Sequence, residues 1–291
     1  MSSDRHHFDV GGFKCIAISD GTFAYPHPTK NVFINFFVNA PEDHLREALK
    51  GYDLVPEQWE EYVSPFTCLV ISKGQDHILV DTGAGNLAPT TGRIIPNLKS
   101  EGISPEDIDT VILTHGHPDH IGGNVDSEGK PAFPNARYVM WKDEWVFWTT
   151  DPDLSGLKID EHGKGVLVNV AQNALRPIRD QLELIEREVE ISPGITAVSA
   201  PGHTPGHMAI KLVSEDAKLV HMSDTVLHPI HLEKPEWCSS VAFDPEKVKA
   251  SRLKLFSEVA SEEAMVIFTH FPFPGLGYII QKGEGWQWQP V

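Results

Sequence analysis

Residues 114–120 narrow the choice of folds for this chain more than any other segment does. They read Thr-His-Gly-His-Pro-Asp-His and directly follow the apolar stretch 110–113. Alternate side chains of an extended segment point to the same side, so His115 and His117 can close on one metal ion. Asp119 and His120 are offset from them and suit a second ion. Because imidazole and carboxylate are the usual ligands of Zn²⁺ and similar ions, the run predicts a metal-binding loop at the end of a strand.

Three later segments supply further candidate ligands. Each places a polar residue after an apolar run, and these residues are His203, Asp224 and His270. Open α/β sheets build their sites at the carboxyl ends of strands, which is where these residues are expected to lie. A site for two metals also needs more donors than residues 114–120 provide. We therefore expect the four segments to converge in space.

With these residues in view, the chain resembles the metallo-β-lactamase superfamily of hydrolases over positions 81–270. The resemblance rests on Asp81-Thr82-Gly83 after an apolar strand, on the HxHxDH run and on the three later candidates. It implies an α/β fold, the four-layer αββα sandwich, with two stacked sheets and helices outside. The implied ligands form two groups that share Asp224 as a bridge: His115, His117 and His203 for the first metal, and Asp119, His120 and His270 for the second.

Two positions distinguish the chain from other branches of this superfamily. Flavodiiron-type relatives carry a glutamate where His117 stands, and the main zinc β-lactamases use a cysteine where this chain has Asp224. The resemblance therefore implies a two-metal hydrolase with two Zn²⁺ ions, or manganese, cobalt or iron in the same sites. Asp119 is the proton-handling candidate of the family. It is predicted to be catalytic as well as a ligand, the alternative being a ligand role alone.

Two segments make the chain look closest to the branch that holds methyl parathion hydrolase and related lactonases. They are the motif Ser19-Asp20-Gly21-Thr22 near the start of the sequence and the aromatic stretch 270–277. This resemblance implies that hydroxide between two metals attacks a small, apolar ester, a lactone being the leading substrate. The alternatives are a phosphotriesterase, a thioesterase and a metal-binding module without turnover. Members of the branch are commonly dimers, so we expect a homodimer.

Four aromatic residues near the candidate ligands are predicted to line a substrate pocket. Trp145 and Trp148 follow the metal run at helical spacing, and Phe271 and Phe273 follow His270. A hydrolase of apolar esters needs flat apolar walls of this kind. Packing in the core is the competing interpretation of the tryptophans.

Two further histidines have weaker assignments. His228 lies four residues after Asp224, near the place where acyl-homoserine lactonases have a tyrosine that assists the substrate carbonyl. It is a candidate substrate-binding residue, with a packing role as the alternative. His207 is predicted to form a hydrogen bond that supports a metal ligand.

The composition argues against several partners. The chain has 41 acidic and 24 basic residues and a net charge of −17, which repels phosphate backbones and disfavours a nucleic-acid partner. No apolar run approaches the roughly 20 residues that span a bilayer, and the first residues do not resemble a secretion signal. We therefore expect a cytoplasmic protein without a membrane partner. Its three dispersed cysteines are predicted to be reduced thiols.

The 291 residues are expected to form one domain, with residues 26–65 as an added segment at the pocket rim or at a subunit interface. Turns are predicted at Asp20-Gly21 and Lys73-Gly74, and a helix start at 104–107. The predicted helices lie at 41–49, from 142 onward, at 167–176 and at 246–260. The predicted strands lie at 13–18, 66–71, 77–80, 110–113, 137–140, 182–189, 195–200, 209–213 and 218–222.

Overall fold

Two mixed seven-stranded sheets form the frame of the molecule in this computed structural model, which describes residues 4–26, 35–52, 54, 61–283 and 285–291. The first sheet contains β1 (Arg5–Val10), β2 (Phe13–Pro26), β3 (Glu61–Lys73), β4 (Asp76–Val80), β5 (Thr110–Leu113), β6 (Arg137–Trp141) and β7 (Leu182–Ile185), in that order. The second, in the order β14 to β8, contains β8 (Val189–Ser192), β9 (Ile195–Ser199), β10 (Met208–Ser214), β11 (Ala217–His221), β12 (Met265–Ile267), β13 (Leu276–Lys282) and β14 (Gly285–Pro290).

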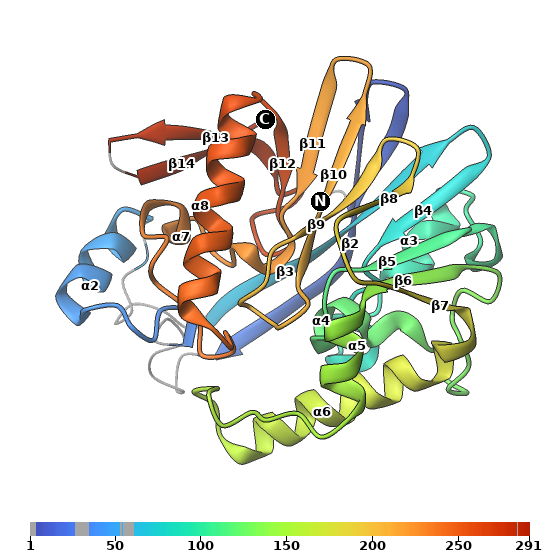
Figure 1. Cartoon of the computed structure of the whole chain (residues 1–291), viewed down its shortest axis with the longest axis horizontal. Helices are drawn as coiled ribbons and strands as arrows, with labels where there is room; N and C mark the ends of the chain where they lie inside the picture. Colours follow the sequence, from blue (N-terminus) through green and yellow to red (C-terminus); the bar gives the residue numbers. More distant parts are fainter. Residues whose placement is uncertain (1–3, 27–34, 53, 55–60, 284) are drawn as a thin grey trace.

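Helices cover the outer face of each sheet (Figure 1). The described α-helices are α2 (Glu42–Lys50), α3 (Ile94–Ser100), α4 (Pro118–Ile121), α5 (Lys142–Thr149), α6 (Glu161–Leu175), α7 (Ile230–Glu233) and α8 (Pro245–Ser261). Side chains of α3, α5 and α6 pack on the first sheet, and those of α8 pack on the second. A third apolar cluster fills the space between the sheets. The predicted four-layer αββα sandwich is therefore confirmed.

Strand β5 shows why the chain forms these layers. Its residues are all buried, with Val111 and Leu113 packed toward the helices and Ile112 packed toward the second sheet. A strand that pairs in parallel with β4 and β6 and is apolar on both faces is stable only in the interior of such a sandwich. The strand ends at Leu113, and the candidate metal run begins directly after it.

The two sheets are joined by backbone hydrogen bonds at the end where the candidate ligands lie. The N–H of Met208 donates to the carbonyl of Thr114 at 3.1 Å, and the N–H of Thr67 donates to the carbonyl of Thr269 at 3.0 Å. Each bond connects a residue of one sheet to a residue adjacent to a candidate ligand. These bonds fix the relative position of loops that are far apart in the sequence.

Three local predictions differ from the structure. The predicted turn at Asp20-Gly21 is wrong, because β2 continues through it with an irregularity in its pairing to β3. The buried Asp20 carboxylate accepts hydrogen bonds from three backbone N–H groups of residues 84–94, which holds the strand at this irregularity. The predicted strand at 182–189 is divided between β7 and β8, which belong to different sheets. Residues 104–107 form only a 3₁₀ turn.

The described part of segment 26–65 packs against the chain that precedes α8. The N–H of Val38 donates to the carbonyl of Cys238 at 2.8 Å, and His231 Nε2 donates to the carbonyl of Phe36 at 3.0 Å. Residues 27–34, 53 and 55–60 of this segment lie outside the described residues. The three cysteines are free, as predicted, and all three are buried. No helix among the described residues is long and apolar enough to cross a membrane.

Candidate metal centre

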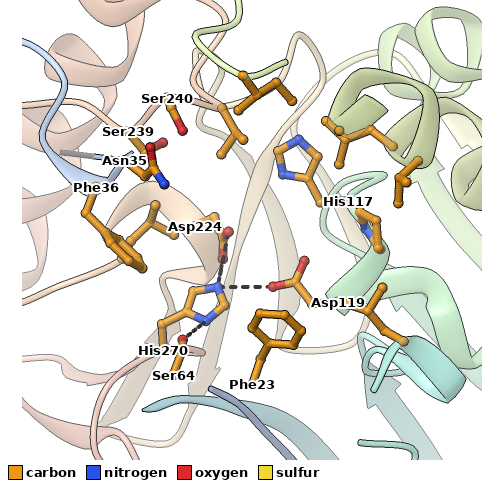
Figure 2. Close-up of a pocket in the computed structure, with 18 of the residues that line it drawn as sticks. Phe23, Asn35, Phe36, Ser64, His117, Asp119, Asp224, Ser239, Ser240 and His270 are labelled. Atoms are coloured by element: carbon orange, nitrogen blue, oxygen red, sulfur yellow. Dashed lines mark hydrogen bonds and ion pairs between the residues drawn. The ribbon is translucent and has the colours of Figure 1, made fainter. Parts of the chain in front are cut away.

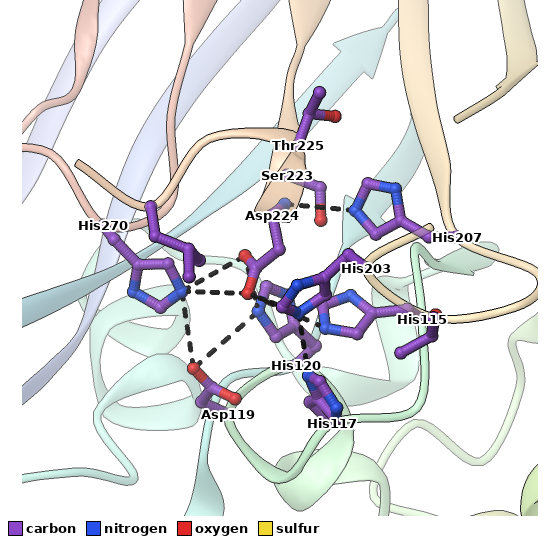
Figure 3. A network of polar contacts seen from close by, with 12 residues as sticks. His115, His117, Asp119, His120, His203, His207, Ser223, Asp224, Thr225 and His270 are labelled. Atoms are coloured by element: carbon purple, nitrogen blue, oxygen red, sulfur yellow. Dashed lines mark hydrogen bonds and ion pairs between the residues drawn. The ribbon is translucent and has the colours of Figure 1, made fainter. Parts of the chain in front are cut away.

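Seven predicted ligands come together at one end of the sandwich (Figure 3). They are supplied by the loop after β5, by α4, by the turn after β9 and by the ends of β11 and β12. The residues are His115, His117, Asp119, His120, His203, Asp224 and His270. Residues from both sheets therefore meet at a single cluster.

The first group consists of His115, His117, His203 and Asp224, all of them buried. His203 Nε2 lies 2.9 Å from His117 Nδ1 and 3.2 Å from Asp224 Oδ2. The same Asp224 oxygen lies 3.8 Å from His115 Nε2. Three ring nitrogens and one carboxylate oxygen thus face a common point.

The second group consists of Asp119, His120, His270 and again Asp224. Asp224 Oδ1 lies 3.1 Å from His120 Nε2 and 3.1 Å from His270 Nε2. Asp119 Oδ2 lies 3.5 Å from His270 Nε2 and 3.8 Å from His120 Nε2. Asp224 therefore directs one carboxylate oxygen toward each group.

These distances fit divalent metal ions. Ligand atoms at 2.0–2.2 Å from a tetrahedral ion lie about 3.3–3.6 Å from one another. The candidate ligand atoms within each group all lie within 4.8 Å of one another. In addition, His115 Nε2 is buried and has no hydrogen-bond partner in the described part of the chain. A buried nitrogen lone pair left in this way is costly, and a cation would satisfy it.

Hydrogen bonds behind the ligands orient the imidazole rings. His120 Nδ1 donates to Asp81 Oδ2 at 2.7 Å, and His270 Nδ1 lies 3.2 Å from both the Ser64 hydroxyl and the Pro65 carbonyl. A proton held at Nδ1 leaves the lone pair at Nε2 free, and in both rings Nε2 faces the cluster. These contacts select the tautomer that binds a metal ion.

Asp81 is itself held firmly at the end of β4. Its carboxylate accepts hydrogen bonds from the backbone N–H and the hydroxyl of Thr114, both at 2.8 Å. Its backbone has a φ of 61°, a left-handed conformation that a non-glycine residue adopts only when its surroundings enforce it. In the sequence, Asp81 is only one residue of a motif on which the resemblance rests. In the structure, its carboxylate supports the ring of His120.

Glu144 is a buried residue of the site that the sequence analysis missed. Its Oε1 accepts hydrogen bonds from the Gly116 N–H at 2.8 Å and from Trp148 Nε1 at 2.6 Å. Its Oε2 accepts hydrogen bonds from the Thr204 hydroxyl at 2.7 Å and from the Gly206 N–H at 2.8 Å. Glu144 thus ties the loop of His115 and His117 to the turn of His203. Its position on α5, apart from both loops in the sequence, gives no local signal of this role.

His207 supports the cluster as predicted. Its Nε2 accepts a hydrogen bond of 3.1 Å from the backbone N–H of Asp224, and its Nδ1 donates to the carbonyl of Ala200 at 2.9 Å. Burial lowers the pKa of His207 to about 3, so the ring is neutral and can accept this bond at physiological pH. The prediction of a supporting hydrogen bond is confirmed.

Three members of the cluster have the charge state that metal binding requires. Burial and the neighbouring imidazoles hold the pKa of His115 and His117 well below the usual range. Burial alone would raise the pKa of Asp224, but the imidazoles of His120 and His270 hold it well below its usual value. Metal ions bind neutral imidazoles and ionised carboxylates. Three members of the cluster therefore already have the required form at neutral pH. Burial lowers the pKa of His120 and His270, but the carboxylates of Asp224 and Asp119 outweigh it and raise both pKa values, so a metal ion would displace a proton from these two rings.

A cavity of about 400 Å³ opens beside the cluster (Figure 2). Four predicted ligands line it, namely His117, Asp119, Asp224 and His270. The other walls are largely apolar and are formed mainly by Phe23, Phe36, Phe66, Leu87, Ile159, Val166, Leu167, Leu227 and Val241. The described part of segment 26–65 contributes Asn35, Phe36 and Ser64 to this wall.

The four aromatic residues predicted to form the pocket are not part of its described lining. Trp148 is fully buried, and Phe271 is stacked on Phe268 with ring centroids 3.9 Å apart in the core under α8. Trp145 packs on the core of the first sheet, and Phe273 packs on the core between the sheets. Burial of their large apolar surfaces explains these positions, which correct the prediction. The core interpretation of the tryptophans is the one that the structure supports.

Gly116 lies so close to Trp148 that a side chain at this position would overlap the indole ring. We expect Gly116→Ala to displace Trp148 or the loop, and overpacking of this kind costs about 1–3 kcal/mol. Because His115 and His117 flank the glycine, the affinity for metal should fall as well. Urea denaturation and metal titration measure the two effects. Gly165→Ala is the control, because Gly165 is exposed and has open space around it. Gly129 is also exposed, but its positive φ makes an alanine there strained.

His228 lies among aromatic rings and not in the described lining of the cavity. Its ring centroid is 5.7 Å from that of Phe37 and 5.3 Å from that of Tyr52. Its Nδ1 accepts a hydrogen bond of 3.2 Å from the backbone N–H of Ile230. The packing role is therefore the one that this structure supports.

Burial lowers the pKa of His228 to about 3. The unfolded chain takes up a proton on this residue below about pH 6.5, whereas the folded chain does not, so acid favours unfolding between about pH 6.5 and pH 3. We expect His228 to contribute about 2 kcal/mol to the stability lost between pH 7 and pH 5. Urea denaturation at both pH values should show a smaller loss for His228→Gln than for the unmodified chain. An equal loss in both proteins would contradict this assignment.

A sandwich of two mixed sheets with paired groups of histidine and aspartate at one end defines a class of metal-binding α/β proteins. The chain belongs to the metallo-beta-lactamase superfamily, whose family model matches residues 63–270.

Individual relatives extend this finding. An N-acyl homoserine lactonase from Bacillus cereus is 25% identical over 226 residues, which cover 71% of this chain and 81% of the relative. The solved structure of AidC, a dizinc quorum-quenching lactonase in complex with the product N-hexanoyl-L-homoserine, is 28% identical. It has a TM-score of 0.90 and the match covers 99% of this chain and 98% of that chain. The structure of the hydrolase AbOPH is 27% identical, with a TM-score of 0.87 and coverage of 100% and 98%.

Proposed function

We propose that this chain is a dinuclear metal-dependent hydrolase that opens the ring of a lactone. The observation that carries the proposal is a largely apolar cavity that ends on two groups of ligands sharing Asp224. The similarity to a Bacillus lactonase and to a dizinc lactonase structure supports the same substrate class.

The proposed first metal would be held by His115, His117, His203 and Asp224, and the second by Asp119, His120, His270 and Asp224. Divalent ions held by these residues would lower the pKa of a bound water and polarise the ester carbonyl. The contribution of the chain is to fix the ligands before substrate arrives. Asp81 serves this purpose by accepting a hydrogen bond from His120, Glu144 by accepting one from Gly116, and Ser64 by its contact with His270 Nδ1.

Asp119 is proposed to handle the proton of the reaction. Its side chain is 19% exposed and lines the cavity, whereas Asp224 is almost fully buried. When the bond between the acyl carbon and the ring oxygen breaks, that oxygen needs a proton to become the product hydroxyl. A carboxylate at the cavity surface can take a proton from water and deliver it to this oxygen.

The charge of the cavity favours a neutral substrate. None of the described residues that line it is a lysine or an arginine, and its acidic side chains are Asp119 and Asp224. The proposed metal ions would lie only where the cavity meets the ligands, so a carboxylate or phosphate group that the substrate carries away from its reacting carbonyl would lack a counter-charge in these walls. This argues against the thioesterase alternative with an acidic thiol carrier and against a nucleic-acid substrate.

A neutral phosphotriester remains the second candidate substrate. It would meet the same apolar walls and the same ligand groups, and nothing in the described lining excludes it. Assays with both substrate types on one preparation distinguish the two activities. The proposal predicts a higher kcat/KM for the lactone than for a phosphotriester such as paraoxon.

Metal removal tests the proposed function. Protein purified with zinc should hydrolyse N-hexanoyl homoserine lactone, lose at least about a hundredfold in rate after dialysis against a chelator, and recover with about two equivalents of Zn²⁺. A metal-binding module without turnover would bind zinc but leave the lactone intact. Lactone hydrolysis that persists in the metal-free protein would also contradict the proposal.

Several finer predictions accompany this function. We propose zinc as the metal because the donors are imidazole nitrogens and carboxylate oxygens, which manganese, cobalt or iron could also use. The homodimer, the cytoplasmic location, the single domain over 1–291 and the rim role of segment 26–65 stay predictions.

A further inference from the structure

Two serine hydroxyls in the cavity wall have no use in the metal centre. Ser239 and Ser240 are only 5% and 4% exposed, and both line the cavity. The hydrogen bonds that these two serines form with the described part of the chain come from their backbone groups and not from their hydroxyls. Because both serines line the cavity, water or a bound ligand can satisfy their hydroxyls. These two groups therefore indicate a polar subsite within an otherwise apolar cavity.

The backbone holds this part of the wall in place from two sides. The N–H of Ser240 donates to the carbonyl of Asn35 at 2.6 Å, and the N–H of Lys158 donates to the carbonyl of Ser240 at 2.8 Å. The N–H of Ala242 donates to the carbonyl of Ser239 at 3.2 Å. A subsite fixed in this way loses little conformational entropy when it binds a ligand.

Asn35 completes the polar patch. Figure 2 shows its side chain beside Ser239 and Ser240, on the side of the cavity that carries Phe36 and Asp224. A side-chain amide offers both a donor and an acceptor, and each hydroxyl can do either. The patch has no charged side chain, so it is complementary to a neutral group that also contains one donor and one acceptor. A secondary amide is such a group.

We propose that Asn35, Ser239 and Ser240 bind the amide of an acylated lactone and make the enzyme prefer it over an alkyl lactone of equal length. This inference rests on the proposed lactonase function. The apolar walls formed by residues such as Phe36 and Leu227 would accept the acyl chain. A substrate without the amide would leave the polar groups of the patch unpaired, which lowers its kcat/KM.

The test compares two substrates that differ in one group. They are N-hexanoyl homoserine lactone and a γ-butyrolactone with an alkyl chain of the same length at the same carbon. The unmodified enzyme should prefer the amide-bearing lactone, and Ser239→Ala combined with Ser240→Ala should lower the ratio of the two kcat/KM values at least about tenfold. Asn35→Leu should lower the same ratio. The control Val166→Ala shortens an apolar wall residue. It should change kcat/KM for both substrates by the same factor and leave their ratio unchanged.

The possible failures are distinguishable. If the zinc-loaded enzyme hydrolyses both lactones and the ratio stays the same in the serine variants, the subsite is wrong and the lactonase function stands. If the enzyme hydrolyses neither lactone, the proposed function fails and the subsite fails with it. Circular dichroism and metal content of each variant verify that a changed ratio does not arise from unfolding or metal loss.

Discussion

Replacing Asp224 by asparagine is expected to lower kcat/KM for lactone hydrolysis at least about a hundredfold. Replacing a residue that only supports a metal ligand already lowers metal affinity or activity about 10–100-fold. Asp224 is proposed to be a ligand of both metals, with Oδ2 3.2 Å from His203 Nε2 and Oδ1 3.1 Å from His120 Nε2. The asparagine amide keeps one oxygen, and its nitrogen does not bind a metal. One group must therefore lose its shared ligand.

Metal analysis and kinetics of this variant give two independent measurements. We expect fewer than two ions per chain together with the loss of activity. Asp216→Asn, in the exposed turn between β10 and β11, provides the matched control because it makes the same chemical change away from the cluster. Two tightly bound ions and normal activity in the Asp224→Asn variant would show that this residue does not bridge the groups.

The second large effect is expected for Glu144→Gln. The buried carboxylate accepts two hydrogen bonds at each oxygen, from Gly116 and Trp148 on one side and from Thr204 and Gly206 on the other. Burial raises the pKa of Glu144, but all four partners are donors, so the site requires an acceptor at both positions. A glutamine presents an NH₂ group to two of these donors. The Thr204 hydroxyl can turn to accept from this group, but a backbone N–H cannot, so at least one buried donor stays unpaired at a cost of about 1–3 kcal/mol.

The loss should extend to metal binding, because Glu144 joins the loop of His115 and His117 to the turn of His203. We expect about a 10–100-fold weaker affinity for zinc in a competition titration with a chelator, as for other residues that support ligands. Asp143→Asn, the exposed neighbour on α5, should change neither stability nor affinity noticeably. If Glu144→Gln lowered stability but bound zinc with normal affinity, the residue would support the fold and not the metal centre.

The sequence predicted those parts of the fold and site that depend on local pattern. Strand β5 was predicted with its observed bounds, because a short run of β-branched and apolar residues that ends in a turn has a strong local signal. The seven candidate ligands converge because each follows such a strand, and the carboxyl ends of neighbouring strands meet at one end of the sandwich. The resemblance to a superfamily supplied the pairing of the two groups, which spacing alone did not determine.

The remaining features depend on contacts between distant segments. Glu144 reaches Gly116 and Gly206 only after α5 has packed beside both loops, and nothing in its surrounding sequence indicates that it is buried. The cavity wall is assembled from β2, β3, α6 and the chain before α8. Aromatic residues next to the metal run were therefore poor guides to the pocket. Their apolar surfaces pack on the cores outside and between the two sheets.

Anomalous X-ray diffraction from crystals of the zinc-loaded protein, recorded on both sides of the zinc absorption edge, tests the central proposal most directly. We expect two peaks per chain, one next to each oxygen of the Asp224 carboxylate. The first should be surrounded by His115, His117 and His203, and the second by Asp119, His120 and His270. A single peak, or peaks away from Asp224, would contradict a dinuclear centre in this protein.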